Sequence, residues 1–385
     1  MHRVLRRSAL SAILFSLLAG SAASVSAASP DAVTGYVYVN NDAAVHNSVA
    51  GFARHGDGSL SPLAGSPFQT GGAGIGSPTG SAGAIQLSSD RRFILAVDPA
   101  SNDISVMRVG RHGSLSLVGT TDSHGTTPLS IAVHRDLVYV ANGGAGGSDY
   151  TGFRLDAGGH LTPIANSTVA LPDSAMPGQV LFSGDGQTLA GTRVGPGAGP
   201  SFIDSFRVGR DGRLTAAPGS PFPAQRIGPF GSEFRPTNPR QLFVSNAHDG
   251  AGNGSVSAYS VGRDASLTAI DGSPFADGQT APCWVEISHD GRYLFAINTG
   301  SSSISRYWIA PDGAMTLLGS TPFKSPTGLR PFDARLDPSG RYLYVVDAGA
   351  VAVSVFAVNG GNLTELASSP VAIPGGVAPF GIVVD

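Results

Sequence analysis

Two stretches of the sequence decide the fold: residues 289–298, which read HDGRYLFAIN, and residues 337–347, which read DPSGRYLYVVD. In each, a tight turn rich in Asp and Gly leads into a run of aliphatic and aromatic residues that ends in Asn or Asp. Runs of this composition favour β-strands, and the turn residues mark where the strand begins. Both stretches therefore predict a short turn followed by a buried strand.

Weaker copies of this unit recur along the whole chain. The predicted strands end at positions 44 to 57 residues apart, namely Asn41, Asp98, Asn142, Thr192, Asn246, Asn298 and Asp347. A further strand, a turn and another strand follow each copy, and Gly-Ser-Pro-Phe closes three units, at 65–68, 219–222 and 272–275. No segment shows the length and period of a helix. Four short strands, repeated seven times, predict an all-β, seven-bladed β-propeller.

The two ends of the predicted domain complement each other. The first strand, residues 36–40, matches the second strand of a unit, and the last, residues 379–384, matches a first strand. Pairing these two strands would complete the first blade with the C-terminal strand and close the ring, which removes open sheet edges. We therefore expect residues 28–385 to form a single propeller domain.

The first 27 residues have the pattern of a cleaved signal peptide. A short basic segment with Arg3, Arg6 and Arg7 precedes an apolar run at 9–19, and small residues lead to Ala27. This order is typical of secretory signals, and the run is too short to span a bilayer. We expect cleavage near Ala27 and a secreted or periplasmic protein.

Charge and cysteine content exclude several classes of partner. Without residues 1–27 the chain keeps 21 basic and 27 acidic side chains, a net charge of −6, and Lys324 is its one lysine. This balance argues against nucleic acid and anionic membranes as partners. No later segment is apolar enough for membrane insertion, and the single Cys283 allows no intrachain disulfide. We expect a monomer whose stability comes from packing.

The repeat unit resembles that of the lactonase-type seven-bladed propellers, which include 6-phosphogluconolactonases, carboxymuconate-lactonizing enzymes and YVTN-repeat proteins. The resemblance extends over the predicted domain and implies the fold and the opening of a lactone ring. Family members commonly have Arg-His and Asn-Glu in blade five, where residues 230–231 are Phe-Gly and 246–247 are Asn-Ala. In blade three, residues 126–130 lack the expected His. The family's acid–base side chains are therefore not implied at these positions.

The two faces of the ring differ in their connections. Tight turns such as 290–292 and 210–212 emerge on one face, and longer loops such as 142–150 and 246–254 emerge on the other. Long loops on a rigid scaffold commonly carry binding sites. We therefore expect the functional face to be the one with the longer loops.

The innermost strands are expected to line the central channel. Alternation along these strands directs one parity of side chains between blades and the other toward the channel. Counted from the prolines that open the strands, the channel parity holds Glu233, Glu286 and Arg335 at the same step of three neighbouring blades. These three residues are the candidate catalytic group, expected at one level of the channel.

Four further residues are candidates for substrate binding. Trp284 and Asp333 share the channel parity and are expected nearer the mouth, and Arg226 and Arg330 precede the strands in the loops above it. An arginine suits the carboxylate or phosphate group of a substrate.

Two functions remain open at this stage. In the first, the protein is an exported lactone hydrolase in which Glu233 or Glu286 acts as general base for water while Arg226 and Arg330 orient an anionic substrate. In the second, Arg335 neutralises the glutamates in a structural network. The protein is then a non-catalytic secreted propeller that binds a ligand or an extracytoplasmic protein on its loop face.

No cofactor is expected, and Ca²⁺ is the one ion that the sequence brings into consideration. Oxygen side chains end several of the predicted strands on the loop face and are of the type that Ca²⁺ prefers: Asn41, Asp98, Asn142, Asn298 and Asp347. Asn and Asp also end strands by capping turns, and we favour that interpretation.

Overall fold

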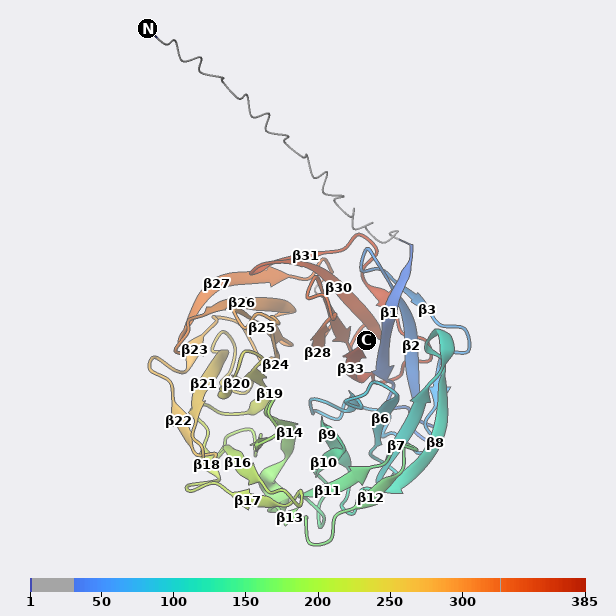
Figure 1. Ribbon diagram of the computed structural model, residues 1–385, viewed down its shortest axis with the longest axis horizontal. Coiled ribbons are helices and arrows are strands. Elements are labelled where there is room, and N and C mark those ends of the chain that lie inside the picture. Colours follow the sequence, from blue (N-terminus) through green and yellow to red (C-terminus); the bar gives the residue numbers. More distant parts are fainter. Residues whose placement is uncertain (2–30, 326) are drawn as a thin grey trace.

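The protein is a ring of seven antiparallel sheets around a central channel, as the computed structural model shows (Figure 1). The structure describes residue 1 and residues 31–325 and 327–385. The predicted all-β propeller is confirmed, and short 3-10 turns, η1 (Arg111–Gly113) and η2 (Asp173–Ala175), are the helical segments of the described chain. The predicted signal peptide lies almost wholly outside the described residues, and no described helix is long and apolar enough to cross a membrane.

Each blade contributes one inner strand to the wall of the channel. From the first to the seventh blade these strands are β33 (Phe380–Val384), β5 (Ile85–Leu87), β9 (Pro128–His134), β14 (Pro177–Phe182), β19 (Pro229–Arg235), β24 (Pro282–Ile287) and β28 (Pro331–Leu336).

The second strand of each blade is the one that the repeat unit predicts. These strands are β1 (Val33–Asn40), β6 (Phe93–Asp98), β10 (Leu137–Asn142), β15 (Thr188–Arg193), β20 (Asn238–Asn246), β25 (Tyr293–Asn298) and β29 (Tyr342–Asp347). The third strands are β2 (Ser48–His55), β7 (Asp103–Val109), β11 (Asp149–Leu155), β16 (Phe202–Val208), β21 (Ser255–Val261), β26 (Ser303–Ile309) and β30 (Ala352–Asn359).

The outer strand is continuous in blades two and six and broken in the other five. The continuous strands are β8 (Leu115–Asp122) and β27 (Met315–Pro322). The broken ones are β3 (Leu60–Pro62) with β4 (Phe68–Gln69), β12 (Leu161–Pro163) with β13 (Val169–Ala170), β17 (Leu214–Ala216) with β18 (Phe222–Pro223), β22 (Leu267–Ala269) with β23 (Phe275–Ala276), and β31 (Asn362–Glu365) with β32 (Val371–Ala372).

At each break in the outer strand, a serine hydroxyl accepts a hydrogen bond from a backbone N–H of the third strand. In the blade that contains β22 and β23, the Ser273 hydroxyl accepts the N–H of Ala258 at 2.8 Å. Serines at the other four breaks accept the equivalent N–H at 2.9 to 3.1 Å: Ser66, Ser167, Ser220 and Ser369. The Gly-Ser-Pro-Phe motif therefore satisfies a buried backbone donor where the outer strand bends away.

The C-terminal strand closes the ring, as predicted. β33 pairs with β1 in antiparallel register, with Val384 opposite Val37 and Ile382 opposite Val39 (Figure 1). The first blade thus combines residues from both ends of the domain. Around the channel, inner strands of adjacent blades contact each other, as β19 contacts β14 and β24.

Buried apolar side chains between adjacent blades form the core. One cluster joins Phe295, Leu343 and Phe356 of blades six and seven, and Val37 and Val355 pack together in another. Apolar contact between the faces of neighbouring sheets is the main stabilising term of such a ring. It holds the inner strands rigidly around the channel.

Candidate active site in the central channel

The candidate catalytic residues lie near the ends of the inner strands, in the half of the channel that opens on the tight turns. Inner strands run from the longer loops to these turns, so we call the two ends of the channel the loop face and the turn face. Glu286 and Arg335 are the last residues but one of β24 and β28, and Glu233 is two residues from the end of β19. The three side chains therefore share the turn-face level of the channel.

The structure brings Glu233, Glu286 and Arg335 together by linking each blade to the next. Glu233 Oε2 accepts the N–H of Ile287 at 2.6 Å, and Glu286 Oε1 accepts the N–H of Leu336 at 2.9 Å. Inner strands are sheet edges, and their outward N–H groups need acceptors. Each glutamate supplies one to the following blade.

An ion pair fixes the second glutamate against the arginine. Arg335 Nη1 lies 2.9 Å from Glu286 Oε2, and the exposed fractions of the two side chains are 25% and 7%. The guanidinium also stacks over the Trp284 ring, with its carbon 4.3 Å from the ring centroid. Arg335 Nη1 is its one hydrogen-bonded nitrogen, and its Nε and Nη2 make no hydrogen bond to any described residue.

The environment of Glu233 favours its neutral form. Burial raises the pKa of Glu233 well above its ordinary 4.5, and the Glu286 carboxylate raises this pKa further, while Arg335 acts in the opposite direction. The side chain keeps some surface on the channel, but protein atoms replace most of its water. Because Oε2 accepts the Ile287 N–H, the proton of the neutral form belongs on Oε1.

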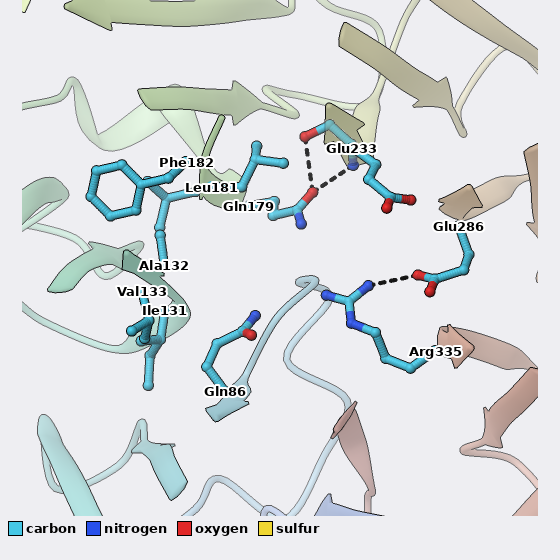
Figure 2. A pocket seen from close by; sticks show the side chains of 12 residues that line it. Gln86, Ile131, Ala132, Val133, Gln179, Leu181, Phe182, Glu233, Glu286 and Arg335 are labelled. Atoms are coloured by element: carbon cyan, nitrogen blue, oxygen red, sulfur yellow. Dashed lines mark hydrogen bonds and ion pairs between the residues drawn. The ribbon is translucent and has the colours of Figure 1, made fainter. Parts of the chain in front are cut away.

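A cavity of about 220 Å³ lies between these residues and the opposite wall of the channel (Figure 2). Its polar wall consists of Gln86, Gln179, Ser232, Glu233, Glu286 and Arg335, and its apolar wall of Ile131, Ala132, Val133, Val180, Leu181 and Phe182. Figure 2 shows the amide groups of Gln86 and Gln179 directed toward the same space as the two carboxyl groups and the guanidinium.

A short segment before β5 crosses the channel above this cavity. We call residues 81–83 the channel segment. Its amides join blade two to distant blades, because the Ala82 N–H donates to Gly178 O at 2.7 Å and the Gly83 N–H donates to Asp333 Oδ2 at 3.0 Å. The Ser81 hydroxyl donates to Leu129 O at 2.8 Å. The segment is thus bonded to blades three, four and seven and divides the channel.

The channel segment covers two of the predicted substrate-binding residues. Trp284 is 1% exposed and packs in the cluster that contains Ala82, and Asp333 is 2% exposed beneath Gly83. Burial raises the pKa of Asp333 to about 7. The sequence places both side chains nearer the mouth of the channel, but in the structure neither lies there. Trp284 instead positions Arg335, and Asp333 holds the channel segment.

Arg226 and Arg330 are separated from the glutamates, so the predicted single cluster does not form. Both are exposed in loops on the loop face. Arg330 precedes β28 and Arg335 lies near its end, about 16 Å further along the strand, with Asp333 and the channel segment between them. The predicted functional face is also wrong for the cavity, which lies toward the turn face.

Apolar residues occupy the loop-face half of the channel. One buried cluster contains the residues that follow the opening prolines of four inner strands: Phe230, Cys283, Phe332 and Phe380. Ala247 belongs to the same cluster. Phe230 and Ala247 stand where the resemblance implied polar side chains, and packing rather than chemistry is their role here.

Sequence reasoning missed Gln86, Gln179 and Ser232. Gln179 Oε1 accepts both the backbone N–H and the hydroxyl of Ser232, which leaves its amide nitrogen toward the cavity. Gln86 lies four residues after Ala82, the same step that separates Glu233, Glu286 and Arg335 from the prolines that open their strands. It was not found from the sequence because blade two has no opening proline from which to count the alternation.

Two of the aspartates considered for Ca²⁺ accept hydrogen bonds within the protein, whereas the Oδ1 atoms of Asn41, Asn142 and Asp347 have no hydrogen-bond partner among the described residues. Asp98 accepts bonds from Asn47, Thr70 and Ser105 at 2.5 to 2.8 Å, and Asp347 accepts one from Ser354 at 2.5 Å. Among the described residues, no group of three or more His, Cys, Asp or Glu side chains is arranged to hold a metal ion.

Fold and site together define a seven-bladed propeller with a carboxylate-lined cavity in its channel. The family model for the lactonase seven-bladed β-propellers matches residues 29–176 and 234–380. The chain therefore belongs to this lactonase family. The unmatched residues 177–233 form blade four and the start of blade five, and they supply Gln179, Leu181, Ser232 and Glu233 to the cavity.

Relatives with assigned names are distant in sequence. The 6-phosphogluconolactonase of Pectobacterium carotovorum is 24% identical over 296 residues, which cover 73% of this chain and 82% of the relative. The periplasmic gluconolactonase of Pseudomonas aeruginosa matches with a TM-score of 0.71 at 17% identity, covering 91% of this chain and 98% of that protein. A candidate 6-phosphogluconolactonase from Bacteroides uniformis matches with a TM-score of 0.73 at 21% identity, covering 91% and 99%. The structural matches establish the shared fold.

Proposed function

We propose that the channel cavity hydrolyses a lactone ring. The observation that carries this proposal is the position of Glu233, whose raised pKa favours the protonated form, beside the ion pair of Glu286 and Arg335. Two carboxyl groups in unlike environments are the arrangement that general acid–base catalysis requires. Membership of the lactonase family supports a lactone as the substrate.

Glu233 supplies the acid in this reaction. Its Oε2 is held by the Ile287 N–H, so the proton on Oε1 is available to the ring oxygen of a lactone in the cavity. Hydrolysis breaks the bond between this oxygen and the carbonyl carbon, and the oxygen leaves as a hydroxyl group after taking the proton.

Glu286 and Arg335 supply the base and the charge stabilisation. The Glu286 carboxylate removes a proton from water as the water oxygen bonds to the carbonyl carbon. Arg335 Nε and Nη2 then stabilise the negative charge that develops on the carbonyl oxygen. The proton on Glu286 returns to Glu233, and the hydroxy acid product releases its own proton to solvent, so the resting state is restored.

The test is a pH-stat assay of protein that begins at residue 28, with glucono-δ-lactone at pH 6.5 and the spontaneous rate subtracted. Glu233→Gln keeps an oxygen for the Ile287 N–H but carries no transferable proton. We expect kcat to fall on the order of 100-fold or more.

Glu365→Gln is the matched control, because Glu365 lies in the outer strand β31, far from the cavity. It should keep the wild-type rate. A Glu233→Gln variant that turns over as fast as Glu365→Gln would contradict the mechanism. Absence of turnover in the wild-type protein would favour the alternative, a propeller that binds a ligand or a protein without reacting.

We also propose that the protein is exported. The support is the pattern of residues 1–27 together with the presence of a periplasmic gluconolactonase among the structural relatives. Expression of the full chain in a Gram-negative host, followed by fractionation and intact-mass measurement, should give a periplasmic or secreted product that begins at residue 28. Full-length protein retained in the cytoplasm would contradict the proposal.

A further inference from the structure

Among the described residues that line the cavity, the one cation is Arg335, and the Glu286 carboxylate already balances its charge. The charged lining residues are Glu233, Glu286 and Arg335, and Arg335 is paired with Glu286 at 2.9 Å. With Glu233 neutral, the charges of the cavity sum to zero. A phosphate monoester carries a charge of about −1.5 to −2 at neutral pH, and a buried charge of this size needs a partner.

The arginines that could hold a phosphate are out of reach of the same substrate. Arg226 and Arg330 lie at the loop face. The channel segment, bonded from Ala82 to Gly178 and from Gly83 to Asp333, lies across the channel between these arginines and the glutamates. A ligand whose lactone ring lies beside Glu233 therefore cannot place a phosphate against either arginine.

Neutral polar groups are available in the cavity instead. Gln179 has its oxygen bonded to Ser232, which leaves its NH₂ group as a donor toward the cavity, and the Gln86 amide makes no hydrogen bond to any described residue. Amide groups donate to and accept from hydroxyl groups without introducing charge. On the opposite side, Leu181 and Phe182 offer an apolar surface to the C–H face of a ring.

We infer that the cavity takes an uncharged, hydroxylated lactone and excludes its phosphorylated counterpart. This inference rests on the proposed function and gives its substrate class. It separates this chain from its relatives named as 6-phosphogluconolactonases. The residues responsible, Gln179 and Leu181 among them, come largely from the segment that the family model leaves unmatched.

The test compares binding and turnover separately. Calorimetry with gluconolactam, a ring amide that resists hydrolysis, and with its 6-phosphate measures recognition without reaction. We expect the uncharged lactam to bind at least 100-fold more tightly than its phosphate. Equal or tighter binding of the phosphorylated lactam would overturn the inference, whatever the turnover assay shows. Binding of the uncharged lactam without turnover of the lactone would count against the proposed function alone.

A charge introduced at Leu181 provides the second arm. Leu181→Arg places an unpaired cation in the cavity wall, and Leu181→Gln is a matched uncharged replacement. The ratio of phosphate to uncharged lactam affinity should rise at least 10-fold in Leu181→Arg relative to Leu181→Gln. An unchanged ratio in a variant with wild-type circular dichroism would show that charge in this cavity does not set specificity.

Discussion

The carboxylate of Glu233 accepts the backbone N–H of Ile287 across the boundary between two blades, at 2.6 Å. Glu286 repeats this relationship one blade further on. The pattern extends over four consecutive boundaries, in which a side chain of one inner strand accepts an N–H of the next: Ser130 from Val180, Gln179 from Ser232, Glu233 from Ile287, and Glu286 from Leu336. The side chains of the candidate active site therefore also accept hydrogen bonds from the backbone N–H groups at the inner edges of the sheets.

Because Glu286 serves both purposes, its removal should destabilise the protein. Glu286→Ala leaves the Leu336 N–H without an acceptor and Arg335 without its ion-pair partner. We expect the free energy of unfolding to fall by about 2–4 kcal/mol, measured by urea denaturation. Asp271→Ala, a change at an exposed turn, should cost less than about 1 kcal/mol. Equal losses in the two variants would show that the pair contributes little.

The blades could be predicted from the sequence, because each blade is specified by local signals. Turn residues and strand composition at 289–298 fix one strand, and its copies fix the others. The common level of Glu233, Glu286 and Arg335 followed from the same logic, since a strand that begins at a proline keeps its side-chain parity.

The position of the site along the channel could not be predicted, because it depends on contacts that are remote in sequence. The Gly83 N–H reaches Asp333, 250 residues away, and the Ala82 N–H reaches Gly178. No pattern in residues 81–83 predicts that the segment crosses the channel. Because the channel segment separates the two halves of the channel, the prediction that Arg226 and Arg330 lie in one cluster with the glutamates is wrong.

The bond between Gly83 and Asp333 should govern the stability of the channel segment. Asp333→Ala removes the acceptor, and the Gly83 amide should then exchange its hydrogen at least about 10-fold faster. Asp333→Asn retains an oxygen at the same place and should exchange near the wild-type rate. Equal protection in the alanine variant would mean that the remaining bonds of residues 81–83 hold the segment alone.

Activity should depend on pH through Glu233. The pKa of this residue is raised, and the acid must be protonated to donate to the leaving oxygen, so kcat should fall as pH rises through a value well above 4.5. The measurement is the pH profile of enzymatic lactone opening, corrected for the spontaneous rate. Glu233→Gln should lose this basic limb along with most of its rate, and a limb that persists in the variant would assign the titration to another group.

The break in the outer strand gives a prediction about stability. Ser273→Ala leaves the buried N–H of Ala258 without its acceptor, and we expect a loss of about 1–2 kcal/mol in the free energy of unfolding. The matched change Ser266→Ala removes an exposed hydroxyl from a turn and should cost less than about 0.5 kcal/mol. Denaturation curves of the two variants would decide whether the serine of the closing motif stabilises the blade.

Three buried aspartates should make the propeller less stable at alkaline pH. Burial raises the pKa of Asp42 and Asp333 to about 7 and that of Asp347 to about 8. A raised pKa means that the folded state binds more protons than the unfolded state between pH 4 and these values. The contribution to stability is therefore complete below pH 4, declines as pH rises above 4, and is lost once pH has passed 7 and 8. The aspartates with lowered pKa, such as Asp90, change their contribution only near and below pH 4 and do not offset this loss.

Thermal unfolding at pH 5 and pH 9 tests this dependence, and we expect the Tm to be lower at pH 9 by on the order of 5 °C. Asp347→Asn should reduce the difference, because an amide keeps an oxygen for the Ser354 hydroxyl but does not ionise. Asp271→Asn, a change at an exposed turn, should leave the difference as in the wild type. A Tm that rises from pH 5 to pH 9 would show that these carboxyl groups fold in their ionised form.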